Sequence, residues 1–260
     1  MSGMARQPLL GLAGVSHRFG AVDVLADVSL SVSHGEFVAI VGPSGCGKST
    51  LLNLCSGWLH PTAGRVERPE RLRMVFQQDG LFPWMTVSEN IDLGLRHVTT
   101  GGERRTRAEA LLALVGLGAF RDHYPHQLSG GMRQRVELAR ALGGDTDLLL
   151  MDEPFSSLDY LSRLRMRLEL ARLLREQPRT VLLVTHDIEE AAQLADRVLV
   201  LSDRPGRIRK EVRLSAPRPR DPTQPEVVRA VHRILTDLGL ETDVEPEVEP
   251  VTTAIQEEPS

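Results

Sequence analysis

A glycine-rich segment is the part of this sequence best suited to bind a phosphate. Residues 42–50 are GPSGCGKST, which matches G-x-x-x-x-G-K-[ST], and they follow the apolar run Phe37–Val41. Glycines let successive backbone N–H groups face one anion, and a following helix adds the positive end of its dipole. A turn that only links a strand to a helix is the alternative, and the flanking strand and helix disfavour it. The predicted phosphate-binding residues are Gly42, Pro43, Ser44, Gly45, Cys46, Gly47, Lys48, Ser49 and Thr50.

Two side chains at the end of this loop suit a nucleoside triphosphate and its Mg²⁺ ion. Lys48 would reach the outer phosphates, and the Ser49 hydroxyl would coordinate Mg²⁺. Magnesium keeps few protein ligands and takes the remainder from phosphate oxygens and water. The loop therefore predicts triphosphate binding, without fixing the class of protein.

Two consecutive carboxylates follow a second apolar run, Leu148–Met151. Asp152 suits the shell of the metal ion. Glu153 suits a general base that polarises the attacking water, a role worth roughly two to four decades in rate. A solvated helix cap is the alternative. The apolar run before the pair and Pro154 after it, which fixes the turn, favour the catalytic interpretation.

A second candidate anion site lies upstream, in the segment LSGGMRQR of residues 128–135. The Ser129 hydroxyl, the Gly130 and Gly131 amides and a helix N-terminus make a cluster of donors suited to a γ-phosphate. Taken alone, the segment is equally consistent with a plain helix cap at Ser129.

The amino-acid composition limits the possible classes of protein. The chain has 260 residues, of which 41% are hydrophobic and 25% charged, so it can form one large domain or two small ones. We expect a cytoplasmic protein, because no apolar run is long enough for a membrane helix and the start lacks a secretion signal. Cys46 and Cys55 are too few for a disulfide framework. Aromatic content of 4% without a basic cluster argues against nucleic acid as a partner.

Apolar runs alternate with helical patterns, which predicts an α/β fold with a mostly parallel sheet and function at the carboxyl ends of its strands. Two loosely alternating segments near the start predict an antiparallel β subdomain around Gly20. The expected strands are Leu10–Phe19, Val24–Val32, Phe37–Val41, Leu72–Phe76, Asp147–Met151, Thr180–Val184 and Arg197–Leu201. Helices are expected at Leu51–Gly57, Arg133–Leu142, Leu161–Glu176 and Ile188–Ala195, and the range Thr86–Gly118 is expected to be largely helical.

The division of the chain follows from this pattern. We expect one nucleotide-binding domain over residues 1–215, with a helical subdomain at about 85–140. A proline-rich extension over 216–240 carries a short helix at Pro225–Leu238. Residues 241–260 are acidic, lack basic residues and are predicted to be disordered.

Six motifs occur in one order: GPSGCGKST, Gln77 after an apolar strand, LSGGMRQR, LLLMDEP, SSLD and Thr185-His186-Asp187. Over about residues 10–214 the chain resembles the ATP-binding subunit of an ABC transporter, a P-loop NTPase. The resemblance implies ATP and Mg²⁺ as cofactors. It also implies a head-to-tail dimer, in which Ser129, Gly130 and Gly131 of one subunit close on the ATP held by the other.

The resemblance also assigns roles to single residues. Gln77 would touch Mg²⁺ and relay between nucleotide and membrane partner. His186 would contact the γ-phosphate, although an exposed polar residue at a helix start is the alternative. Asp159 would bridge the dimer, and Phe19 would stack on adenine, where such proteins usually have a tyrosine.

An aromatic loop after Gln77 points to a partner protein. Residues 79–87 are DGLFPWMTV, and Leu81, Phe82, Pro83 and Trp84 form the predicted interface. An exposed tryptophan of this kind more often anchors an interface than lies on the surface without a role. Packing of the tryptophan beneath its loop is the alternative. This loop, together with DEPFSSLD and LSDRPGRI, is similar to importer ATPases for nitrate, taurine and other sulfonates.

The leading hypothesis is therefore an ATPase at the cytoplasmic face of the membrane, held there by separate integral permease subunits. An extracytoplasmic solute-binding protein would act with it indirectly and select the cargo. An importer ATPase for another small solute, or a soluble ABC ATPase without a membrane partner, are the alternatives. A small-molecule kinase would have no need of LSGGMRQR.

Overall fold

A six-stranded sheet lies at the centre of the computed structural model, which describes residues 8–76, 80–96 and 101–240. The strand order is β5-β6-β7-β3-β8-β9, and only β9 runs antiparallel to its neighbour. The strands β3, β6, β7 and β8 are buried along their whole length, as expected for parallel strands covered on both faces. Their bounds are β3 Phe37–Val41, β5 Leu72–Val75, β6 Leu148–Asp152, β7 Thr180–Val184, β8 Arg197–Leu201 and β9 Ile208–Arg213.

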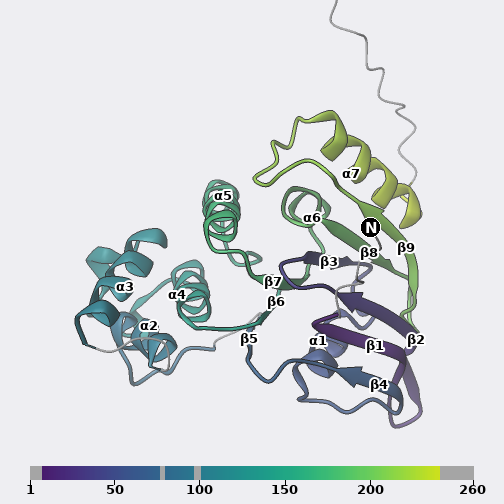
Figure 1. The fold of residues 1–260 in the computed structure, drawn as a ribbon, viewed down its shortest axis with the longest axis horizontal. Coiled ribbons are helices and arrows are strands. Elements are labelled where there is room, and N and C mark those ends of the chain that lie inside the picture. Colours follow the sequence, from purple (N-terminus) through teal and green to yellow (C-terminus); the bar gives the residue numbers. More distant parts are fainter. Residues whose placement is uncertain (1–7, 77–79, 97–100, 241–260) are drawn as a thin grey trace, which may run out of the picture.

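A separate three-stranded antiparallel sheet has the order β2-β1-β4. Strand β1 (Leu10–Phe19) turns at Gly20 into β2 (Val22–Val32), and β4 (Ala63–Glu67) pairs with the other edge of β1. Helix α1 (Lys48–Ser56) lies between the two sheets, and its leucines share one apolar core with side chains of both (Figure 1). The phosphate-binding loop is therefore held from two sides.

The remaining helices fall into two groups (Figure 1). Helices α2 (Val87–Leu95), α3 (Gly101–Leu114) and α4 (Gly130–Gly143) form a lobe beside β5, with short 3-10 helices at Gly118–Phe120 and Pro125–Gln127. Helices α5 (Tyr160–Glu176) and α6 (Ile188–Leu194) follow β6 and β7. Within the described ranges, none of the helices combines the length and the apolar character needed to cross a bilayer.

The architecture confirms the expected α/β fold with a mostly parallel sheet, an antiparallel sheet and a helical lobe. Two strands were not expected. Strand β4 buries none of its residues fully, and β9 exposes charged side chains while burying Val212, so neither carries the apolar run that marks a strand.

The segment after β9 returns to the body of the chain. Helix α7 (Pro225–Asp237) buries Val227, Ala230 and Ile234 in the core that also contains the sheet. The Arg220 side chain is 2% exposed and donates hydrogen bonds to the carbonyls of Ala216 (2.8 Å) and Ala195 (2.7 Å). The residues predicted to be a disordered tail, 241–260, lie outside the described part of the chain.

We predict that Arg220→Met destabilises the protein by about 2–4 kcal/mol, because the buried carbonyls lose their donors while the apolar stem is kept. Urea denaturation followed by circular dichroism measures the free energy of unfolding. Arg229→Met is the control, since Arg229 is exposed on α7, and it should change that free energy by less than about 0.5 kcal/mol. Equal losses in the two variants would contradict the prediction.

Candidate functional site

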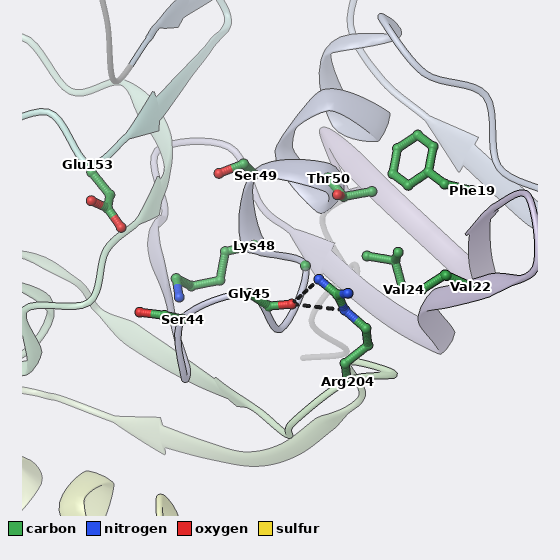
Figure 2. A pocket seen from close by; sticks show the side chains of 11 residues that line it. Phe19, Val22, Val24, Ser44, Gly45, Lys48, Ser49, Thr50, Glu153 and Arg204 are labelled. Carbon is green, nitrogen blue, oxygen red and sulfur yellow. Dashed lines mark hydrogen bonds between the residues drawn. The ribbon is translucent and has the colours of Figure 1, made fainter.

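An open cavity of about 530 Å³ lies where the phosphate-binding loop meets the antiparallel sheet (Figure 2). Its walls combine groups suited to three parts of a nucleotide. The half-exposed Phe19 ring and two valines offer an apolar face for a base, the loop offers amides, and a carboxylate closes the far side. The lining residues are Phe19, Val22, Val24, Ser44, Gly45, Gly47, Lys48, Ser49, Thr50, Glu153 and Arg204.

The loop has the backbone that its glycines predict. Gly45 (φ 76°) and Gly47 (φ 105°) adopt left-handed conformations, and a Cβ on Gly47 would lie 2.9 Å from the Leu25 side chain. Gly47 caps α1 without a side-chain hydrogen bond, which leaves first-turn N–H groups able to donate to an anion. The Lys48 ammonium donates to the carbonyls of Gly42 (2.8 Å) and Pro43 (2.9 Å), so it lies folded against the loop.

Asp152, the last residue of β6, lies next to the start of α1. Burial raises the pKa of Asp152, with a further increase from the charge of Glu153, while the Ser49 side chain and the charge of Lys48 oppose the shift. Its Oδ1 atom is buried and has no hydrogen-bond partner within the described part of the chain. The pair Ser49–Asp152 therefore presents hard oxygen donors to the site.

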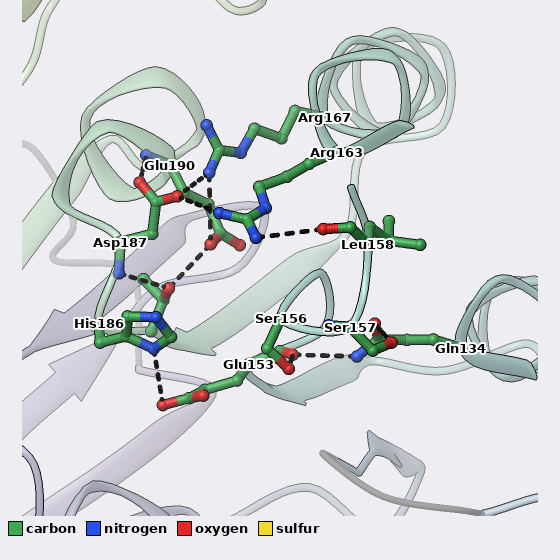
Figure 3. Close-up of polar contacts among 11 residues, drawn as sticks. Gln134, Glu153, Ser156, Ser157, Leu158, Arg163, Arg167, His186, Asp187 and Glu190 are labelled. Atoms are coloured by element: carbon green, nitrogen blue, oxygen red, sulfur yellow. Dashed lines mark hydrogen bonds and ion pairs between the residues drawn. The ribbon is translucent and has the colours of Figure 1, made fainter. Parts of the chain in front are cut away.

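Glu153 turns its side chain in a different direction from Asp152. Its backbone is left-handed (φ 46°), its N–H donates to the Val184 carbonyl (2.8 Å), and its own carbonyl accepts from Gln134 Nε2 (3.1 Å). The carboxylate lines the cavity, and its Oε1 lies 3.1 Å from Nδ1 of His186 (Figure 3). Two of the three side chains predicted to act in catalysis thus contact each other.

A buried ionic cluster lies behind His186 (Figure 3). Asp187 caps α6 and is ion-paired with both Arg163 and Arg167. Glu190 is 3% exposed, accepts a hydrogen bond from the Thr185 hydroxyl (2.8 Å) and lies 3.9 Å from Arg167. Burial raises the pKa of Glu190 from its ordinary value of 4.5 to about 7, although the arginines oppose this shift.

Several predicted site residues do not line this cavity. Ser129 caps α4 by accepting from the Met132 N–H (3.3 Å), and Gly130 and Gly131 form the first turn of that helix. Asp159 is exposed and caps α5 through the Ser162 N–H (3.0 Å). These four positions lie away from this cavity, and Gln77 lies outside the described residues.

The aromatic loop before α2 is exposed yet firmly held. Trp84 is 68% exposed, and its ring centroid lies 5.4 Å from that of Phe82. Asn90, fully buried, accepts from the Phe82 N–H (2.9 Å) and donates to the carbonyls of Phe82, Met85 and Thr86. Leu81 is partly buried, and Pro83 is exposed. The tryptophan is thus presented to solvent on a fixed backbone.

Some residues of the site escaped sequence reasoning. Gln134 lies in LSGGMRQR, and its spacing after Ser129 gives no sign that it bonds Glu153 and Ser157. Arg163 and Arg167 lie one helical turn apart on α5, a spacing that surface arginines also show. Arg204 lies in LSDRPGRI, a stretch that supported the family resemblance without a role of its own. Outside the cavity, Trp58 is 72% exposed and makes a tilted ring contact with Phe76, with 5.4 Å between the ring centroids.

Comparison with known sequences gives close matches. The family described as ABC transporter matches residues 25–156. The aliphatic sulfonates import ATP-binding protein SsuB 1 of Rhodococcus jostii is 49% identical over 81% of this chain and 85% of its own length. The taurine import ATP-binding protein TauB of a Jannaschia species is 45% identical over 79% of this chain and 82% of its own length.

Solved structures with a similar fold are also ABC transporter cassettes. A dimeric bacterial ABC transporter cassette superposes with a TM-score of 0.71 at 36% identity, over 80% of this chain and 99% of its own. A second dimeric cassette, in a post-hydrolysis state bound to ADP and Pi, superposes with a TM-score of 0.70 at 35% identity and the same coverage.

We predict that Glu153→Gln lowers kcat for ATP hydrolysis by about 10²–10⁴-fold, because the amide cannot take the proton of the attacking water. ATP affinity should stay within about threefold, since the change keeps the shape of the side chain. Steady-state ATPase assays and titration with a fluorescent ATP analogue measure the two quantities. Glu176→Gln, an exposed change at the end of α5, serves as the control. A fully active Glu153→Gln variant would contradict the role.

We also predict that Glu190 makes the free energy of unfolding depend on pH. Its folded-state pKa is raised from 4.5 to about 7, so its contribution to stability is fully present below about pH 4.5 and is lost as the pH rises towards 7. Glu190→Gln removes this dependence. The free energy of unfolding of the variant relative to the parent should rise by on the order of 2 kcal/mol between pH 5 and pH 8.

Chemical denaturation across this pH range measures the difference between variant and parent. Glu189→Gln is the matched control, because Glu189 is its exposed neighbour on α6 and should give a difference independent of pH. A pH-independent difference for Glu190→Gln would show that Glu190 is ionised throughout.

Proposed function

Because the chain belongs to the ABC transporter family and is an ATPase of that family, we propose that it is the energy-coupling subunit of a membrane importer for a small sulfonate-like anion. The observation that carries this proposal is the convergence of Lys48, Ser49 and Glu153 on one cavity, with His186 against Glu153. Relatives named as sulfonate and taurine import proteins support this class of cargo. We include nitrate among the proposed cargo anions.

The proposed mechanism uses groups already described. Phe19 stacks on adenine, and the amides of residues 42–50 surround the phosphates. Lys48 exchanges its two neutral carbonyl partners for the anionic oxygens of the outer phosphates, which form stronger, charge-assisted hydrogen bonds. Glu153 takes the proton of the attacking water, and His186 fixes the orientation of that carboxylate and contacts the γ-phosphate.

Magnesium fits the oxygen donors of this site. Ser49 and Asp152 would hold the ion, and Gln77 is proposed as a further contact. The buried Oδ1 of Asp152, which has no hydrogen-bond partner among the described residues, is the observation that supports the fit. When bound, the ion would neutralise phosphate charge, and its own charge would favour the ionised form of Asp152.

We propose that hydrolysis requires a head-to-tail pair of subunits. Ser129, Gly130 and Gly131 lie away from the cavity of their own chain, and the structural relatives are described as dimeric. In the proposed pair, the first turn of α4 meets the γ-phosphate held by the other copy, and Asp159 lies at the contact. We also propose residues 1–215 as the ATPase domain, 85–140 as its helical subdomain and 216–240 as an extension.

The membrane partner is proposed to be an integral permease that binds the surface of Leu81, Phe82, Pro83 and Trp84. Exposed aromatic side chains on a fixed backbone suit an interface anchor, because little conformational entropy is lost when a partner binds. The permease would hold the subunit at the cytoplasmic face of the membrane, and a solute-binding protein outside would select the cargo.

Capture of the tagged subunit from solubilised membranes tests this function. We expect permease subunits to co-purify and to stimulate ATP hydrolysis. The solute-binding protein of the same system should bind a sulfonate or nitrate. Nucleic acid or ribosomes without a membrane protein would overturn the importer in favour of a soluble ATPase.

We predict that Trp84→Ala weakens binding of the permease by at least about tenfold, because it removes a large exposed anchor. ATP hydrolysis by the isolated subunit and its melting temperature should remain close to the parent values. Val228→Ala, an exposed change on α7 on the opposite side of the molecule from α2, is the control (Figure 1). Loss of folding in Trp84→Ala would instead show that the tryptophan packs beneath its loop.

A further inference from the structure

The turn between β8 and β9 lies against both the phosphate-binding loop and β2. Its ends are closed by hydrogen bonds between Ser202 and Arg207: the Ser202 N–H donates to the Arg207 carbonyl (2.9 Å), and the Arg207 N–H donates to the Ser202 hydroxyl (3.0 Å). Gly206 then pairs with β2, donating to the Val24 carbonyl (2.8 Å) and accepting from the Ala26 N–H (3.1 Å). The turn is therefore attached to the strand that lines the apolar side of the cavity.

Gly206 allows this turn to approach the phosphate-binding loop. A Cβ at this position would collide with the Cys46 carbonyl and lie 3.1 Å from the Leu25 side chain. The close approach brings the neighbouring Arg204 within reach of the loop, although its side chain is itself exposed.

Arg204 holds one peptide of the loop by two hydrogen bonds. Its Nε (3.1 Å) and Nη2 (2.8 Å) both donate to the carbonyl of Gly45, as Figure 2 shows. The peptide bond is planar and trans, so the Cys46 N–H points away from this carbonyl. A charged donor on the oxygen both fixes the plane of the peptide and strengthens the N–H on its other side. That N–H makes only a long contact, 3.3 Å, with the Pro43 carbonyl.

We propose that Arg204 is a positioning residue, which orients the Gly45–Cys46 peptide so that its N–H donates to a nucleotide phosphate. The proposal rests on the nucleotide-binding function of the same cavity. Since Arg204 also lines that cavity, direct contact with the base is the competing role, and the two roles make different predictions. Positioning of the loop affects every ligand with the same phosphates equally, whereas contact with the base depends on which base is bound.

Arg204→Met tests the proposal, because it keeps the apolar stem and removes the donors. We expect the Kd values for ATP and ADP to rise together by about tenfold, the loss typical of a charged hydrogen bond. The KM for ATP should rise similarly while kcat stays within about twofold, and the ratio of ATP to GTP affinity should not change. Arg204→Lys should recover part of the affinity, since an ammonium group can still donate to the Gly45 carbonyl.

Arg209→Met is the matched control, because Arg209 is exposed on β9 and its loss changes the net charge equally. Its Kd values should stay within about twofold of the parent. Unchanged affinity in Arg204→Met, or a changed ratio of ATP to GTP affinity, overturns the proposal while leaving the ATPase function intact. A parent protein that binds neither ATP nor ADP would overturn both together, and equal melting temperatures exclude misfolding as the cause.

Discussion

The left-handed backbone at Glu153 is the constraint on which the arrangement of the site depends. Of the two adjacent carboxylates at the end of β6, that of Asp152 is buried and that of Glu153 lines the cavity, so they must point to different places. A positive φ in a residue with a side chain is unfavourable and persists only when its surroundings enforce it. Here the peptide is fixed by β7 through the Val184 carbonyl and by the helical lobe through Gln134. Displacement of either element would therefore move the proposed catalytic base.

The side chain of Arg163 connects the loop after Glu153 to the loop that carries His186. Arg163 donates to the Leu158 carbonyl (3.2 Å), in the segment before Asp159, and to the carboxylate of Asp187 (3.3 Å). One guanidinium thus bridges the segment proposed to meet a second subunit and the segment that orients the proposed base. If closure of a dimer shifts the first, the rigid geometry of the guanidinium transmits the shift to the second.

Sequence reasoning succeeded where function or burial imposes a local pattern. The glycine-rich loop between a strand and a helix, the buried strands β3, β6, β7 and β8, and the antiparallel pair around Gly20 were all predictable from neighbouring residues. It failed for contacts between segments distant in the chain. Gln134 bonds a carbonyl 19 residues away, and Arg204 bonds one 159 residues away. The sequence near either residue does not indicate its partner, because these polar side chains meet their partners only after the sheets and helices have packed together.

The charged strand β9 ends one side of the central sheet and has a consequence for how copies of the chain meet. An uncovered strand edge carries unpaired N–H and C=O groups that can add a strand from another molecule, and charged side chains along it oppose such pairing. Residues 209–211 of β9 are charged and exposed, while Val212 anchors the strand inward. This edge thus resists continuous β-sheet growth and the aggregation that follows from it.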